Sequence, residues 1–203
     1  PLVWLVLVTA AIAAVVASTV SRAPDGPVLT SGQRKIIDEL VSVLMHDTPV
    51  PQYARIVNQY DSRGFVSGIG DFSTADGSTL AVVRAYQALA GENNLSRDFL
   101  PTLERLAATR SAQTDELVGF VDAWRRASDD PAFRQAQSEV LYTRSYLPAF
   151  ERARELGLTS ALGVAILYDT LLQHGGAADP DGLPALITRT RDRVGGLPPD
   201  VRE

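Results

Sequence analysis

The chain of 203 residues contains no cysteine. This absence excludes disulfide bonds, thiolate metal sites and cysteine nucleophiles, but leaves the compartment open, because exported proteins can also lack cysteine. Lysine occurs once, as Lys35, so arginine supplies the other basic side chains. The formal net charge is -5 and no basic stripe is present, which argues against a nucleic-acid partner. An acidic surface suits either simple solubility or attraction to a cationic polymer.

The common catalytic motifs are also missing. There is no phosphate-binding Walker loop, no G-x-S-x-G elbow and no H-E-x-x-H. The two histidines, His46 and His174, stand far apart and lack the spacing of zinc ligands. We therefore expect no metal ion and no cofactor, and place each histidine at a helix end or in the packed interior.

The longest apolar run covers residues 1–21, and Arg22 is the first ionised side chain. A helix of about 20 residues spans roughly 30 Å, the hydrocarbon thickness of a bilayer. We expect a single-pass transmembrane anchor there, with the folded part at the membrane and extracytoplasmic. The competing interpretation is a secretory signal peptide cleaved near Ala17 and Ser18. Residues 22–30 hold two prolines and a glycine, which predicts a linker.

Residues 31–203 have the hydrophobic spacing of a mainly α domain. Thr30 and Gln33 form a capping box ahead of an apolar stripe, and Pro51 predicts the first turn of a second helix that includes Tyr53 and Tyr60. The segment at 160–174 is apolar on nearly every face, so it should be central and buried. Further helices are expected from Ser78 to Gly91, around 117–124, from Asp130 to Gly157 with a break or kink at Pro148, and at 183–194.

Residues 61–77 are rich in glycine and small polar residues, which predicts a loop with one or two short strands. Asp61 opens this segment directly after the expected second helix. Its carboxylate could orient or deprotonate water, or it could be satisfied by N–H groups of a turn. Asp169 lies within the apolar segment at 160–174 and needs an arginine partner, for which Arg189 and Arg191 are candidates.

The order of residues resembles that of the family 46 chitosanases. The matching positions, which span roughly residues 33–185, are Tyr53, Asp61, Arg63, Gly64, Gly68, Ile69, Phe72, Phe120, Trp124, Phe133, Gln135, Ala136, Gln137, Tyr146, Pro148, Ala149, Tyr168, Asp169, His174, Gly175, Asp179 and Pro180. The resemblance implies a lysozyme-like, two-lobed helical fold with a cleft between the lobes. It also implies an inverting glycosidase that cuts β-1,4 glucosamine polymers, and a domain that lacks the C-terminal part of the family.

The resemblance further implies roles for individual residues. Asp61 matches the carboxylate that activates water, and Asp169 matches an aspartate of a charge network behind it. Arg63 matches an arginine near the site. The remaining candidates for substrate binding are Tyr53, Ser67 and Asp76.

One expected group is missing, because the family's general acid is a glutamate that ends the first long helix. Met45 aligns with it, and methionine cannot donate a proton; His46 and Asp47 are the candidate substitutes. Two functions therefore stay open. The chain is either a membrane-anchored chitosanase-like hydrolase, or a catalytically inactive domain that serves as an accessory subunit of a membrane protein complex or as a glycan-binding module.

Overall fold

The computed structural model describes residues 27–195. The expected anchor at residues 1–21 and most of the expected linker at 22–30 lie outside this range. Within the range, no helix has the length and hydrophobicity needed to cross a bilayer. The described part is mainly helical with a short β segment, as the sequence predicts.

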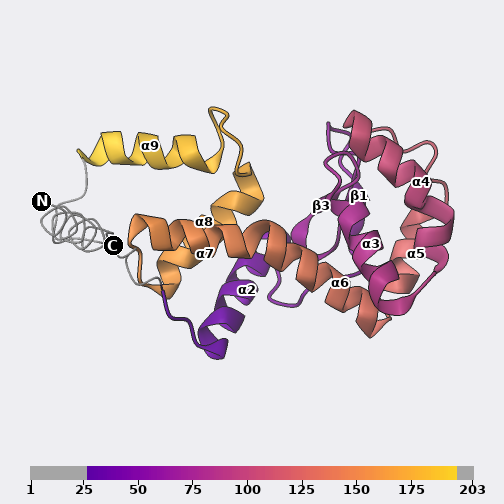
Figure 1. Ribbon diagram of the computed structural model, residues 1–203, viewed down its shortest axis with the longest axis horizontal. Coiled ribbons are helices and arrows are strands. Elements are labelled where there is room, and N and C mark those ends of the chain that lie inside the picture. The colour runs from indigo at the N-terminus through magenta and orange to yellow at the C-terminus, as the bar shows by residue number, and fades with distance from the viewer. Residues whose placement is uncertain (1–26, 196–203) are drawn as a thin grey trace, which may run out of the picture.

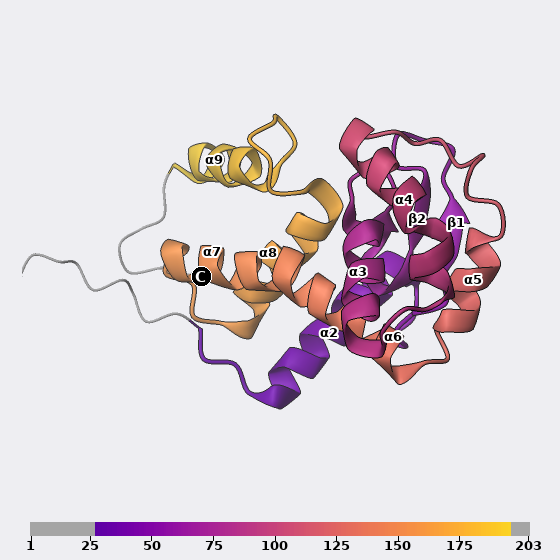
Figure 2. The same ribbon diagram turned by 45° about the vertical axis from the view of Figure 1, so that its right-hand side comes forward.

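The chain forms two lobes that lie side by side and are joined by one continuous helical run (Figure 1). Figure 2 shows the same division from a second direction, with α6 at the junction. The elements are α2 (Ser31–His46), β1 (Ile56–Asn58), β2 (Phe65–Ser67), η1 (Gly68–Gly70), β3 (Phe72–Ser73), α3 (Ser78–Ala90), α4 (Asn94–Thr109), α5 (Phe120–Ala127), α6 (Pro131–Leu141), the π-helix η2 (Tyr142–Tyr146), α7 (Leu147–Leu156), α8 (Ala161–His174) and α9 (Leu183–Val194).

The larger lobe holds the three strands and α3 to α6 around an aromatic core. Trp124 and Phe133, both fully buried, meet edge to face with ring centroids 4.8 Å apart. The Trp124 indole N–H donates to the carbonyl of Tyr53 at 3.0 Å, and the Gln137 side-chain amide donates to the same oxygen at 3.0 Å. These bonds from α5 and α6 fix the chain where it enters the sheet.

The smaller lobe is built from α2, η2, α7, α8 and α9. Ile37 and Val41 of α2 pack in the same cluster as Tyr146, whose ring meets Tyr168 of α8 edge to face at 5.5 Å. Leu141, the last residue of α6, packs against the cores of both lobes. The α6–η2–α7 run therefore sets how the lobes meet.

Several helix boundaries follow the sequence prediction. The capping box at Thr30 and Gln33 is confirmed: Gln33 N donates to Thr30 Oγ1 at 3.2 Å, and Thr30 N donates to Gln33 Oε1 at 2.9 Å. Asp130 caps α6 by accepting from Ala132 N at 2.8 Å, with Pro131 in the first turn. The last helix covers the predicted residues 183–194.

The predicted second helix is wrong. After Pro51 the chain makes turns and then enters strand β1, whose Ile56 pairs with Ser67 of the antiparallel β2, which in turn pairs with β3. The physical reason is tertiary, because Gly68 N donates to Arg55 O at 2.7 Å while the Tyr53 carbonyl is held from α5 and α6. Asp61 therefore follows a strand and not a helix.

Three further expectations need correction. Pro148 does not break the helical run, since η2 continues directly into α7; the proline, which lacks a backbone N–H, stands just after the π-helix. Helix α8 is not buried on every face, since Leu162 and Ile166 are exposed. Ser78 is the first residue of α3, and the cap is Gly77 with φ +82°. The sequence analysis did not identify α4, which carries Pro101 inside it.

Candidate active site

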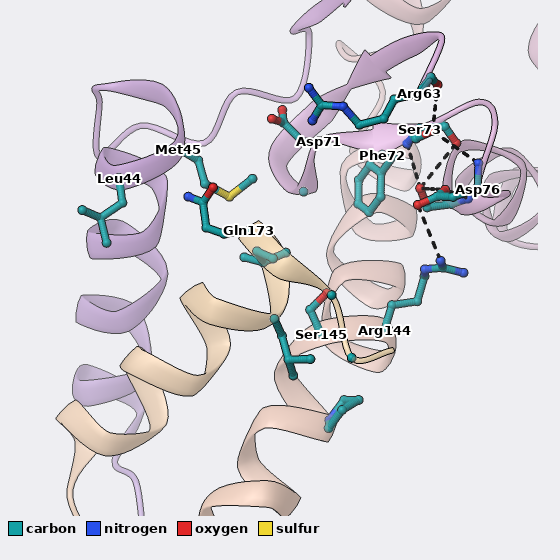
Figure 3. Close-up of a pocket in the computed structure, with 17 residues that line it drawn as sticks. Leu44, Met45, Arg63, Asp71, Phe72, Ser73, Asp76, Arg144, Ser145 and Gln173 are labelled. Carbon is teal, nitrogen blue, oxygen red and sulfur yellow. Dashed lines mark hydrogen bonds and ion pairs between the residues drawn. The ribbon is translucent and has the colours of Figure 1, made fainter. Parts of the chain in front are cut away.

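A cleft of about 630 Å³ lies where the lobes meet. One wall comes from the loop and strand residues of the larger lobe, and the other from the ends of α2 and α8 and from the η2–α7 run (Figure 3). Its lining comprises Leu44, Met45, Arg63, Gly70, Asp71, Phe72, Ser73, Asp76, Ser78, Arg144, Ser145, Pro148, Leu171, Leu172, Gln173, Gly175 and Gly176.

The end of α2 brings Met45 into the cleft, in contrast to its two neighbours. Met45 is half-buried and lines the cavity. Asp47 is the C-cap residue in the left-handed conformation, with φ +58°; it is exposed and is not part of the cleft lining. The His46 side chain is only 2% exposed, so it cannot touch a ligand in the cleft as it stands. Of these three residues, the structure places only Met45 at the cavity surface.

His46 is packed beneath Asp71, a cleft residue that the sequence analysis did not identify. The His46 Nδ1 atom is 4.0 Å from Asp71 Oδ1, and neither ring nitrogen has a hydrogen-bond partner in the part of the chain described. Burial lowers the pKa of His46, and the neighbouring Asp71 carboxylate opposes this shift. The imidazole is therefore mostly neutral near pH 7.

Asp71 ends the short helix η1 and has φ +47°. Its Oδ1 accepts a short hydrogen bond from Arg55 Nη1. Burial raises the pKa of Asp71, and the charges of Arg55, His46 and Arg63 pull it the other way. In the sequence Asp71 is one of several aspartates in a glycine-rich segment. Its place inside the run G-I-G-D-F is the one sequence feature that could have identified it as a site residue.

Asp61 is exposed in the turn between β1 and β2; it is not part of the cleft lining, but it bonds to Arg63, which is. Its Oδ1 accepts from Arg63 N at 2.8 Å, and its Oδ2 accepts from Arg63 Nε at 2.9 Å and Nη2 at 2.8 Å. The hydrogen bonds from the Arg63 side chain and backbone lower the pKa of Asp61 and keep it ionised. Figure 3 shows the Arg63 side chain extending toward Asp71.

Asp76 stands on the opposite side of Phe72 from Asp71 (Figure 3). Its Oδ1 accepts from Ser78 N at 2.7 Å and from the Ser78 hydroxyl, and its Oδ2 lies 4.0 Å from Arg144 Nη2 of the η2 segment. Asp76 and Arg144 thus form a contact between walls that come from different parts of the chain.

The other two predicted binding residues, Ser67 and Tyr53, make contacts within the larger lobe. Ser67 is fully buried, and its hydroxyl donates to the Phe72 carbonyl at 3.2 Å. Tyr53 holds the loop through its carbonyl, and its ring lies 5.8 Å from the Arg134 guanidinium carbon. Neither residue lines the cleft.

Asp169 belongs to a different cavity, of about 470 Å³, between α8 and α9. Its Oδ1 is buried and has no hydrogen-bond partner within residues 27–195. Arg191 lines the same cavity, whereas Arg189 lies 3.9 Å from Asp181. The structure therefore does not join Asp169 to Asp61 or Arg63.

The cleft thus combines carboxylates with arginines that come from both lobes. No group of three or more potential metal-ligating side chains occurs within residues 27–195. The carboxylates of such an arrangement can bind polar or cationic groups of a ligand, and carboxyl groups can act as proton donor and proton acceptor in hydrolysis.

Comparison with known proteins gives the same assignment from sequence and from structure. The profile of Glycosyl hydrolase family 46 matches residues 39–201. The chain is 39% identical over 172 residues to a chitosanase of Bacillus subtilis, covering 85% of this chain and 62% of the relative. It is 33% identical over 129 residues to a Streptomyces chitosanase, covering 64% and 45%. The chain therefore spans less than two thirds of the length of these relatives.

Two solved structures of chitosanases have a similar fold. A mutant chitosanase from Bacillus subtilis MY002 in complex with 6 GlcN superposes with a TM-score of 0.80 at 39% identity, covering 85% of this chain and 71% of that one. A GH46 chitosanase of Gynuella sunshinyii in complex with chitotetraose gives a TM-score of 0.80 at 39% identity, covering 87% and 72%. The chain belongs to glycosyl hydrolase family 46.

Proposed function

We propose that this chain is a chitosanase-like glycoside hydrolase that cleaves a β-1,4-linked amino-sugar polymer in the cleft between its lobes. The observation that carries the proposal is the cleft itself, with Asp71 and Asp76 in its lining and Asp61 bonded to the lining residue Arg63. Protonated glucosamine units are cations, and carboxylates can bind their ammonium groups. Relatives with the same fold are known in complex with 6 GlcN and with chitotetraose.

The proposed chemistry is hydrolysis with inversion at the anomeric carbon. In such a reaction one carboxylate deprotonates water on one face of the sugar while a carboxylic acid protonates the leaving oxygen on the other. Asp61 is suited to the first task, because its hydrogen bonds from Arg63 hold it ionised and its side chain is open to solvent. Water bound there loses its proton to Asp61 as its oxygen attacks the sugar.

The test measures reducing ends released from chitosan by the full chain, by Asp61→Asn and by the control Asp98→Asn, an exposed aspartate of α4. We expect Asp61→Asn to lose about 10²–10⁴-fold in rate and Asp98→Asn to match the wild type. NMR of the first product should show the α-anomer. A wild type that releases no reducing ends would refute the hydrolase proposal, and a β-anomer would refute inversion.

A second candidate is glycan binding without cleavage, favoured by one observation. Met45 occupies the cleft at the place where the resemblance implies a proton-donating glutamate. In this case the domain serves as a glycan-binding module or as an accessory subunit of a membrane protein complex. Retention of the chain by immobilised chitosan, together with no release of reducing ends, would support this candidate over hydrolysis.

We also propose that residues 1–21 anchor the protein in a membrane with the cleft on the extracytoplasmic side. The support is the uncharged run that ends at Arg22. The full chain should stay in the membrane fraction after alkaline extraction, and a chain that lacks residues 1–21 should not. Recovery of both forms in the soluble fraction would contradict the anchor.

A further inference from the structure

The cleft needs a proton donor if it hydrolyses a glycosidic bond, and Met45 cannot be one. Resting on the hydrolase function proposed above, we propose that Asp71 is the general acid of this site, and that its Oδ2 atom carries the proton to the leaving group.

Two carboxyl groups contribute to the described lining of the cleft, those of Asp71 and Asp76. Asp76 accepts from both the backbone N–H and the hydroxyl of Ser78, and its second oxygen lies 4.0 Å from Arg144. Its side chain is 57% exposed. Solvent, two donors and a nearby guanidinium all favour the ionised form, so Asp76 is a poor store for a proton.

Asp71 has the opposite surroundings. Its side chain is 22% exposed, and the interactions within residues 27–195 all fall on one oxygen, Oδ1, from Arg55 and His46. Oδ2 has no partner in that range, which leaves it available to a ligand in the cleft. The carboxyl is also fixed in direction, because Arg55 holds Oδ1 and the backbone is in the left-handed region, which is uncommon for a residue other than glycine.

The charged neighbours divide the two aspartates into an acid and a base. Arg63 bonds to Asp61 through both Nε and Nη2 and also acts on Asp71 through its charge, so one guanidinium lies within electrostatic reach of both. Burial raises the pKa of Asp71 against the pull of Arg55, His46 and Arg63, whereas hydrogen bonds from Arg63 lower the pKa of Asp61. Two carboxyls driven apart in this way match the acid and base of a hydrolase.

His46 acts through Asp71 and does not touch the substrate. Its buried ring places Nδ1 4.0 Å from Asp71 Oδ1, so it is a positioning residue that sets the surroundings of the acid. The pKa of His46 is itself lowered by burial, so the charge with which His46 pulls down the pKa of Asp71 is present only at a pH below that lowered pKa.

The proton on Asp71 Oδ2 passes to the glycosidic oxygen as the bond from that oxygen to the anomeric carbon breaks. The oxygen of one water forms the new bond to the same carbon from the opposite face, and its proton passes to Asp61. Both aspartates then regain their starting protonation by exchange with solvent.

The first test compares wild type, Asp71→Asn and the control Asp98→Asn on two substrates. One is chitosan, and the other is a glucosamine oligosaccharide with a dinitrophenyl leaving group, which departs without a proton. We expect Asp71→Asn to lose about 10²–10⁴-fold on chitosan, to stay within about tenfold of wild type on the activated substrate, and to lose the alkaline limb of the kcat profile. Asp98→Asn should match wild type on both.

The second test restores an acid elsewhere. Met45→Glu places a carboxyl on the facing wall of the same cleft, so the double variant Met45→Glu/Asp71→Asn should regain at least about tenfold on chitosan over Asp71→Asn. If wild type is active and Asp71→Asn is equally active on chitosan, this assignment is wrong while the hydrolase function stands. If Asp71→Asn loses both substrates equally and Met45→Glu restores neither, Asp71 has a binding or structural role and the assignment is again wrong. A wild type inactive on both substrates would overturn the hydrolase function and this assignment with it.

Discussion

Gly68 begins η1, which leads to the cleft residues Gly70 and Asp71, and replacing Gly68 by alanine tests how rigidly this segment is held. Gly68 has φ +68°, a conformation that costs an L-residue about 1–2 kcal/mol. An added Cβ would overlap Gln137 Oε1 and lie 3.1 Å from Trp124 Cζ2. Gln137 cannot move freely, because it is fully buried, donates to Tyr53 O and accepts from Ile69 N at 3.2 Å. Overpacking adds about 1–3 kcal/mol, so Gly68→Ala should lose about 2–5 kcal/mol in total.

A matched control separates the clash from the backbone strain. Gly157 at the end of α7 is left-handed, with φ +73° and ψ +20°, and a Cβ there meets no atom within 4 Å. Gly157→Ala should therefore lose only the strain, about 1–2 kcal/mol. With a urea m-value of about 2 kcal/mol per molar, the two variants should differ by about 0.5–1.5 M in unfolding midpoint, followed by circular dichroism. Because Gly68 begins the turn that carries Asp71, Gly68→Ala should also lower cleavage of chitosan.

The double variant Gly68→Ala/Gln137→Ala completes the test. Removing the Gln137 side chain opens the space that the new methyl group needs, so the double variant should lose less stability than the sum of the two single variants. Equal midpoints for Gly68→Ala and Gly157→Ala, with strict additivity in the double variant, would mean that Gln137 is not a fixed neighbour of Gly68. Contacts with α6 would then not determine the position of Asp71.

Three more predictions concern stability and use urea unfolding with the same readout. Burial lowers the pKa of His46 in the folded state below its usual 6.5, so on acidification the unfolded state takes up a proton before the folded state does. The free energy of unfolding should therefore fall from about pH 7.5 to about pH 5, and His46→Gln should reduce this fall. Tyr86 donates to Asp130 Oδ2 at 2.7 Å and its pKa is raised to about 12, so Tyr86→Phe should cost about 1.5–3 kcal/mol, and no change would mean that the bond is not formed in solution. Thr30→Ala removes the cap of α2 and should cost about 1 kcal/mol. The control is Thr48→Ala, at a half-buried threonine outside the helices whose Oγ1 accepts from Val50 N at 3.2 Å and caps no helix.

The sequence predicted those parts of the fold that depend on neighbouring residues. The Thr30–Gln33 box and the Asp130–Pro131 pair act within one helical turn, so their chemistry is readable from the chain alone. Strand β1 was missed because the spacing of Tyr53, Ile56 and Tyr60 also fits a helix. What decides its conformation is the hydrogen bond from Trp124, 71 positions away, which no local pattern reveals.

The same difference between local and long-range contacts explains which residues of the site could be predicted from the sequence. The family resemblance drew attention to Asp61, whose main contacts are with Arg63 two residues away in the same turn. Asp71 becomes distinctive only after folding, when Arg55 bonds to one oxygen and the end of α2 buries His46 beneath it. Burial is a tertiary property, so the raised pKa that separates Asp71 from the other loop aspartates has no counterpart in the order of residues.

The position of the general acid decides which part of the fold sets its distance from the base. An acid at position 45 would come from α2 and a base at Asp61 from the larger lobe, so their separation would depend on how the lobes meet through α6 and η2. Asp61 and Asp71 instead lie in the two connections of one three-stranded sheet, before and after β2, and both are influenced by the charge of Arg63. Inverting hydrolysis needs a defined gap of about 6.5–9.5 Å between its carboxyls. With both groups in connections of the same sheet, hydrogen bonding between its strands would set that gap, and the smaller lobe would supply the other wall of the cleft.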